Sequence, residues 1–129
     1  MKKSIFLSLF LLFALSFNAT ISAQWVKLGE RAVNFSMDRD EINVTVMKGT
    51  FKRLKFIVRK APIYMKNVRV VYGNGESTNI RVRRSIAKGT ESPVFDLPGK
   101  NRIIKKIVFN YRSIPTFKGR GLVEAFGKR

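Results

Sequence analysis

The side chains that could do chemistry in this chain are carboxylates, lysines, arginines and tyrosines, because the sequence contains no histidine and no cysteine. Without these two residue types the chain cannot build a Ser-His-Asp triad, a thiol nucleophile or an ordinary zinc or copper site. A phosphate-binding loop is also missing, since Gly73-Asn74-Gly75 is not followed by Gly-Lys-Ser/Thr. The composition therefore restricts acid–base catalysis at neutral pH to carboxylates, Lys or Tyr.

Paired carboxylates are the catalytic arrangement that this composition leaves open, because two of them can hydrolyse a glycosidic bond. No spacing singles out a pair among the eight acidic residues, which are Glu30, Asp38, Asp40, Glu41, Glu76, Glu91, Asp96 and Glu124. Acidic side chains in turns that pair with the many Lys and Arg residues are the favoured interpretation. The sequence therefore predicts that the protein is not an enzyme and needs no cofactor, with a carboxylate-based hydrolase as the catalytic alternative.

A short acidic segment is the candidate for a metal site. Asp38, Asp40 and Glu41 supply the clustered carboxylate oxygens that calcium prefers. Arg39 lies between them, however, and no complete calcium-binding loop follows. An Asp-rich turn, in which Asp side chains accept backbone N–H groups and pair with Arg31 or Arg39, explains the segment better. No metal is predicted, and these three residues are weak calcium candidates.

Basic residues outnumber acidic ones by 18, and several of them recur on one side of predicted strands. Lys55 and Arg59 share the outward side of one strand, Arg69 lies outward on the next, and Arg81 and Arg83 on a third. If these strands are neighbours, the five side chains form one positive surface. Such a surface would bind phosphates, sulfates or carboxylates and would release them at high salt. The alternative is a solvated basic surface that serves solubility.

Trp25 suggests a different function, because aromatic rings stack on sugar rings. Tyr64, Phe51 and Phe117 lie near predicted loops and could join it in a carbohydrate-binding site. A Trp that opens the first strand of a sandwich more often packs on the core, and core packing is the favoured interpretation.

The elements that must position these side chains are short strands. Apolar and polar residues alternate across 32–37, 42–46, 54–59, 68–72 and 80–83, which is the period of a strand. Turn residues interrupt the alternation about every ten residues, and Asn74-Gly75 is a strong hairpin signal. Residues 102–112 also fit helical spacing, but their β-branched and aromatic content favours a strand. We therefore predict an all-β fold, an antiparallel β-sandwich of jelly-roll type with eight or nine strands, as one domain over residues 24–129.

Residues 1–23 have the pattern of a secretory signal peptide. Lys2 and Lys3 precede an apolar run from Ile5 to Phe17, and small residues follow as far as Ala23, after which we expect cleavage of the signal helix. The apolar run is shorter than the roughly 20 residues of a membrane-spanning helix. Export to the periplasm or the cell exterior follows as an expectation. Without a cysteine for lipid attachment or a second long apolar segment, we expect a soluble protein and not a lipoprotein.

Three sequence motifs resemble those of a family of short secreted bacterial domains of unknown function. Residues 25–31 follow the pattern W-x-x-L-G-x-R, residues 38–40 follow D-R-D, and residues 96–107 follow D-L-x-G-x-x-R-x-I-x-x-I. The resemblance covers nearly all of residues 24–129. It implies a β-sandwich and brings no catalytic residues with it.

Export and charge together predict a partner. Only Lys2 and Lys3 of the basic residues lie in the signal segment, so the exported domain keeps a net charge of about +16. Outside the cytoplasm, anionic envelope components and acidic glycans are better candidates than nucleic acid for such a domain. The sequence thus favours a non-catalytic, polyanion-binding module. A carbohydrate-binding module and a structural or protein-interaction domain are the alternatives.

Overall fold

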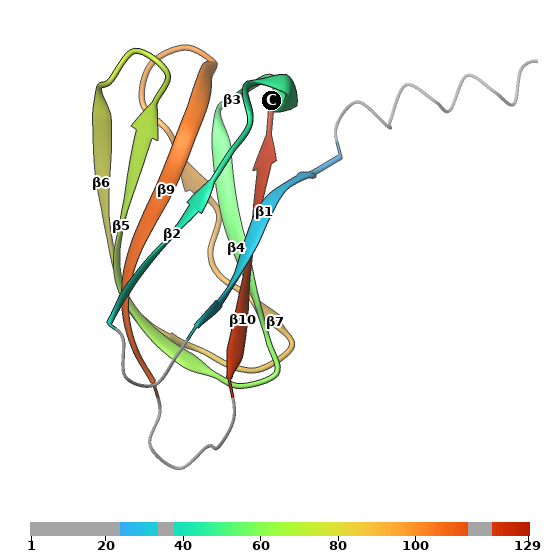
Figure 1. Ribbon diagram of the computed structural model, residues 1–129, viewed down its shortest axis with the longest axis vertical. Helices are drawn as coiled ribbons and strands as arrows, with labels where there is room; N and C mark the ends of the chain where they lie inside the picture. The colour runs from blue at the N-terminus through green and yellow to red at the C-terminus, as the bar shows by residue number, and fades with distance from the viewer. Residues whose placement is uncertain (1–23, 34–37, 114–119) are drawn as a thin grey trace, which may run out of the picture.

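The computed structural model describes residues 24–33, 38–113 and 120–129, and these residues form two packed β-sheets (Figure 1). The predicted signal segment lies outside the described residues, and so do Phe35, Met37 and Phe117. The strands are β1 Val26–Val33, β2 Arg39–Asn43, β3 Thr50–Phe51, β4 Arg53–Arg59, β5 Ile63–Tyr72, β6 Ser77–Ile86, β7 Thr90–Glu91, β8 Phe95–Asp96, β9 Arg102–Ser113 and β10 Gly121–Lys128. A short 3-10 helix, η2 (Val46–Lys48), connects β2 to β3.

The two sheets are antiparallel and contain five strands each. In the first, which we call sheet A, the order is β1-β10-β4-β7, with β8 also paired to β4. In the second, sheet B, the order is β2-β9-β5-β6, with β3 also paired to β9. The prediction of an all-β antiparallel sandwich is confirmed, and residues 102–113 form a strand, as expected.

The strand pairing gives the sandwich a jelly-roll topology. Strand β1 pairs with β10, β2 with β9, β4 with β7 and β8, and β5 with β6, so the chain runs like one long hairpin whose tip is the β5–β6 turn. Rolling this hairpin up brings β4 against β10 and β5 against β9, which completes the two sheets. The predicted number of eight or nine strands is wrong. The described residues contain ten, because β3, β7 and β8 are separate pieces of only two residues each.

Alternating apolar residues of the two sheets build the core between them. Leu54, Phe56 and Val58 of β4 are fully buried and face inward from sheet A. The ring of Phe56 lies 6.5 Å from that of Phe109 on β9, so the contact joins the two sheets. Each large apolar side chain buried in this way stabilises the fold by about 1.5–3 kcal/mol. This core must hold together a strongly charged chain.

A buried carboxylate joins the sheets at one edge of the sandwich. Asp40 on β2 accepts a hydrogen bond from Arg31 Nε of β1 at 3.0 Å and another from the Tyr111 hydroxyl of β9 at 2.9 Å. The Asp40 side chain is only 8% exposed. Close to it, β1 passes so near β2 that a Cβ on Gly29 would lie 2.6 Å from Ile42 Cγ2. Arg31, Asp40 and Gly29, which belong to the sequence motifs, therefore hold β1 against sheet B.

We predict that Asp40→Ala lowers the free energy of unfolding by about 2 kcal/mol, because it removes two hydrogen bonds to a charged acceptor. Urea denaturation followed by circular dichroism measures this loss. Asp38→Ala is the matched control, since Asp38 is exposed, and it should cost less than about 0.5 kcal/mol. Equal losses in the two variants would show that Asp40 does not join the sheets.

Candidate anion-binding surface

The positive charge of the domain is divided unequally between the two sheets. The strands of sheet A contain six basic and four acidic residues, whereas those of sheet B contain ten basic and two acidic ones. The excess charge therefore lies on sheet B.

Ion pairs neutralise most of the outer face of sheet A. Glu124 lies in the middle of this face on β10, and its two oxygens accept hydrogen bonds from Arg59 Nε at 2.7 Å and Lys27 Nζ at 3.1 Å. On the neighbouring strands, Lys55 pairs with Glu91 at 3.0 Å, and a further pair joins Arg53 and Asp96 at 3.2 Å. Most cations of this face are thus already paired with carboxylates, and Lys128 Nζ lies 5.7 Å from the centroid of the Trp25 ring.

The Glu124 carboxyl is ionised more easily than an ordinary one. Burial raises its pKa, but the hydrogen bonds from Arg59 and Lys27 lower it by more, so the pKa lies below its ordinary value of 4.5. The side chain is 10% exposed. Lys27 is affected in the opposite direction, since its hydrogen bonds to Glu30 and Glu124 raise its pKa above 10.5. This cluster stabilises sheet A and presents little free charge.

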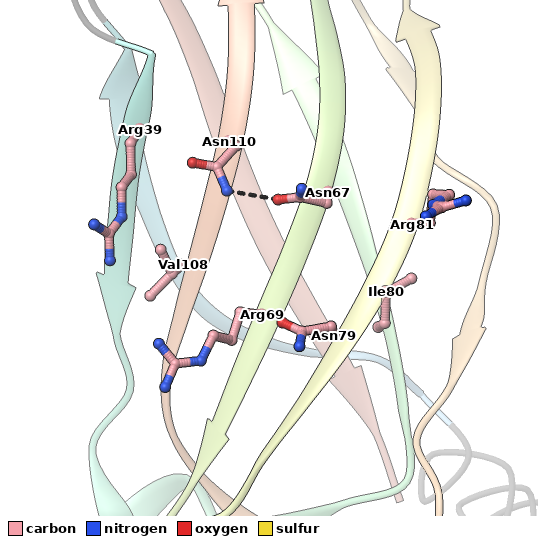
Figure 2. Close-up of a pocket in the computed structure, with 8 residues that line it drawn as sticks. All are labelled: Arg39, Asn67, Arg69, Asn79, Ile80, Arg81, Val108 and Asn110. Atoms are coloured by element: carbon pink, nitrogen blue, oxygen red, sulfur yellow. Dashed lines mark hydrogen bonds between the residues drawn. The ribbon is translucent and has the colours of Figure 1, made fainter.

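The outer face of sheet B carries a hollow of about 480 Å³, within the size range of small-molecule sites. Its lining contains three arginines, three asparagines and two aliphatic residues, which are Arg39, Arg69, Arg81, Asn67, Asn79, Asn110, Ile80 and Val108. Figure 2 shows Arg39 and Arg69 extending toward the same part of the sheet from β2 and β5, while Arg81 lies at the β6 edge. The hollow combines positive charge with side-chain amides.

Strand register places these polar side chains in rows across the sheet. Arg39 is opposite Asn110, Asn110 is opposite Asn67, and Asn67 is opposite Arg81, so one row crosses β2, β9, β5 and β6. In the next row, Val108 is opposite Arg69, and Arg69 is opposite Asn79. Asn110 Nδ2 donates to Asn67 Oδ1 at 2.5 Å and joins the middle of the first row.

None of the three arginines in the hollow pairs with a carboxylate of the described residues. Glu41 lies on the same outer face as these arginines, but it is 3.7 Å from Lys106 Nζ and forms its ion pair there. The guanidiniums of Arg39, Arg69 and Arg81 therefore keep their full charge toward solvent.

The five basic residues predicted to bind an anion do not share one face. Strand β4 belongs to sheet A, so Lys55 and Arg59 lie on the other side of the sandwich, paired with Glu91 and Glu124. The structure brings together Arg69 and Arg81, whose strands are neighbours. Arg83 is exposed further along β6, at a bulge where its φ is +46°. The condition for a common surface, that the three strands are neighbours, is not met because β4 and β5 belong to different sheets.

Sequence reasoning missed Arg39 and the three asparagines of the hollow. Arg39 was considered only as a neighbour of the acidic residues Asp38 and Asp40. Asn110 stands between the inward residues Phe109 and Tyr111, and this alternation could have identified it as outward. The position of Asn67 depends on a bulge that the sequence does not indicate.

The aromatic residues of the carbohydrate-binding alternative do not come together among the described residues, and Phe117 lies outside them. Trp25 lies outside the core on sheet A, half-buried, with Lys55 Nζ 4.5 Å from its ring centroid, so the favoured core packing was wrong for this residue. Tyr64 lies on sheet B under the guanidinium of Arg112, at 4.5 Å. Phe51 is fully buried. These three aromatic residues share no common surface.

The three weak calcium candidates also separate. Asp40 turns inward to Arg31 and Tyr111, Glu41 turns outward to Lys106, and Asp38 is exposed. Over the ranges that the structure covers, no group of three or more acidic side chains is placed to hold a metal ion. Apart from Asp38, every acidic residue of the chain lies in an ion pair with Lys or Arg.

A second, more apolar hollow lies at the end of the sandwich. Val46 of η2 and Ile103 of β9 line it beside Tyr72, and Val46 is 66% exposed. Within the same described part of the chain, no helix has the length and apolar character needed to cross a membrane.

Comparison with known proteins places the chain in a family and supports the fold. The sequence matches the family described as a domain of unknown function, DUF2541, over residues 5–127. No curated protein matches it. Among solved structures, AlgX of Pseudomonas aeruginosa has a TM-score of 0.54 at 12% identity, with 80% of this chain and 26% of AlgX covered. At this identity the likeness concerns the fold alone, and the chain spans about a quarter of AlgX.

Two further solved structures are similar at lower TM-scores. The SPBc2 prophage-derived protein YomS has a TM-score of 0.41 at 19% identity, with 78% of this chain and 93% of YomS covered. The coat protein of Tobacco streak virus has a TM-score of 0.39 at 18% identity, with 81% and 85% covered.

The Glu124 cluster predicts an acid-dependent loss of stability. The pKa of Glu124 in the folded protein lies below 4.5, so its ionised carboxylate contributes fully to the stability of the fold above pH 4.5. This stabilisation is lost as the pH falls through the pKa of the folded protein. We predict that Glu124→Gln lowers the free energy of unfolding by about 1.5–3 kcal/mol at pH 7, and that the difference from wild type shrinks below pH 4. Urea denaturation of both proteins between pH 2 and 7, in steps of roughly half a pH unit, measures the two free energies of unfolding.

Glu91→Gln is the control for this measurement, because Glu91 is 54% exposed and its pair with Lys55 should contribute less than about 1 kcal/mol. A difference between wild type and Glu124→Gln that stays constant with pH would contradict the assignment.

Proposed function

Since the chain belongs to the DUF2541 family, whose function is unknown, we propose its function from the surface of sheet B. The protein is a non-catalytic binding module that holds an anionic partner against the hollow between β2 and β6. The observation that carries this proposal is the set of three arginines, Arg39, Arg69 and Arg81, which line one hollow without a carboxylate partner among the described residues.

The chemistry of these arginines favours an anion. A guanidinium presents parallel N–H donors that fit a carboxylate, sulfate or phosphate in a bidentate way. Three of them around one hollow repel each other, and an anion between them relieves this repulsion. Sheet A does not compete for the partner, because Glu124 and Glu91 already hold its main cations.

The remaining parts of the proposal rest on the sequence and on the ion pairs. The signal pattern of residues 1–23 supports export, which makes an envelope or extracellular anion a better partner than nucleic acid. None of the described residues that line the hollow is aromatic, so they offer no stacking platform for bases. The pairing of Asp40, Glu91 and Glu124 with basic residues supports a non-catalytic role, since it leaves these carboxylates unavailable for acid–base chemistry.

Heparin chromatography tests the proposal with two charge-matched variants. The first, R39Q/R69Q/R81Q, removes three positive charges from the hollow. The second, K52Q/K88Q/K100Q, removes three from exposed loop residues that lie outside it. We predict that the hollow variant elutes at clearly lower salt than wild type, with a shallower dependence of affinity on salt, because up to three charge contacts are lost.

The loop variant should elute close to wild type, since it has the same net charge as the hollow variant but keeps the hollow. Equal shifts in the two variants would mean that heparin responds to net charge only, and the proposal would be wrong. Thermal unfolding of both variants shows whether they are folded before the comparison is made.

A further inference from the structure

We infer that the anionic partner is an acidic polysaccharide, whose carboxylate or sulfate groups bind the guanidiniums of the hollow while its hydroxyl groups bind the amides. This inference rests on the proposed function and names its ligand class. It is carried by the amide side chains that lie between and beside the arginines, because an amide oxygen needs a hydrogen-bond donor, which a simple anion does not supply.

The order of residues across the sheet suits an extended chain with alternating groups. In the first row, Arg39 and Arg81 stand at the two ends, and Asn110 and Asn67 stand between them. Neighbouring strands lie about 4.8 Å apart, so the row spans roughly 14 Å across four strands. A linear polymer lying across the strands would meet a cation, then two amides, then a second cation.

The hydrogen bond between the two amides decides which groups remain for a ligand. Asn110 Nδ2 donates to Asn67 Oδ1, which occupies one donor of Asn110 and one lone pair of Asn67. The Asn67 amide nitrogen and the Asn110 oxygen remain available, and Figure 2 shows that oxygen turned away from Asn67, toward the side of Arg39. The pair therefore offers both a donor and an acceptor.

This combination distinguishes a sugar from a simple anion. Phosphate, sulfate and carboxylate groups only accept hydrogen bonds at their charged oxygens, so none of them can donate to the exposed carbonyl oxygen of Asn110. A sugar hydroxyl donates and accepts, and can satisfy both free groups of the amide pair. Arg39 and Arg69 can meanwhile grip carboxylates bidentately.

The positions of Arg39 and Arg69 indicate that the binding site is preorganised. Val108 lies on the outer face but is only 3% exposed, and Figure 2 shows Arg39 and Arg69 on either side of it. The apolar stems of these two arginines can cover Val108 while their charged ends stay in solvent. Holding the side chains in this way lowers the entropy lost on binding.

An anionic lipid surface fits this face less well. Stable docking on a membrane combines cations with exposed apolar side chains that enter the lipid. Of the described large apolar residues, the most exposed, Val46 and Met47, lie on η2 at the end of the sandwich and do not line the hollow. The polysaccharide is therefore the ligand class that the hollow supports.

The test compares polygalacturonate with three probes that each lack one of its features. Methyl-esterified polygalacturonate keeps the hydroxyls and loses the charge, and polyphosphate keeps the charge and loses the hydroxyls. Vesicles containing an anionic phospholipid present phosphate on a membrane. We expect polygalacturonate to bind at least about tenfold tighter than any of the three, a difference of about 1.4 kcal/mol.

Variants of the amides separate this inference from the proposed function. N67A/N110A keeps every charge and should weaken polygalacturonate binding about tenfold while leaving polyphosphate binding unchanged. N43A/N101A is the matched control, since both residues are exposed and lie outside the hollow. If the double variant fails to fold, Asn79→Ala tests the same point, because the exposed Asn79 makes no side-chain hydrogen bond within the described structure.

The outcomes are distinguishable. If the amide variants bind polygalacturonate as wild type does, or if polyphosphate or vesicles bind equally well, the ligand class is wrong. The proposed function still stands in that case provided that R39Q/R69Q/R81Q weakens binding of the anions. If that variant and K52Q/K88Q/K100Q behave alike, both the ligand class and the proposed function are wrong.

Discussion

A shortage of carboxylates is the constraint on which this structure depends. Eight acidic residues are available to pair with 26 basic ones, so the positions of the acidic residues decide where unpaired positive charge remains. Sheet A receives four of them, and Glu124 at its centre holds both Arg59 and Lys27. Sheet B receives two, one of which, Asp40, turns inward to join the sheets. One sheet is thereby almost neutral, whereas on the other, within the described residues, Arg102 and Lys106 pair with carboxylates and most of the remaining cations do not.

The fold was predictable because a strand with one buried face has alternating apolar and polar residues in its sequence. Buried Leu54, Phe56 and Val58 alternate with half-buried or exposed residues along β4, and the same holds for most of the long strands. Alternation does not say which strands are neighbours. The turn through Lys60, which has a φ of +71°, and buried Pro62 carries the chain from sheet A to sheet B. Basic residues on consecutive strands therefore ended on opposite faces of the sandwich.

The motif residues that looked most chemical have structural roles. Asp40 was a weak calcium candidate, yet both of its oxygens accept hydrogen bonds from within the protein, from Arg31 and Tyr111. Gly29 permits the close approach of β1 to Ile42. A sequence motif records what the fold requires as readily as what a ligand requires, and here the geometry of these residues assigns them to the fold. The residues of the hollow lie mostly outside the motifs, with Arg39 as the exception.

Two adjacent bulges, one on β5 and one on β6, determine which side chains form the first row of the hollow. Met65 is opposite Tyr111, but the next pair across β5 and β9 is Asn67 with Asn110, so Lys66 is an extra residue on β5. In a regular ladder Lys66 would stand opposite Asn110, and the middle of the row would carry a third cation. The bulge places a neutral amide there instead, between Arg39 and Arg81. Lys66 stays on β5, so the bulge leaves the charge of sheet B unchanged and alters only its arrangement. The amide pair that results is the part of the hollow that would give the proposed ligand a hydrogen-bond donor and an acceptor between two cations.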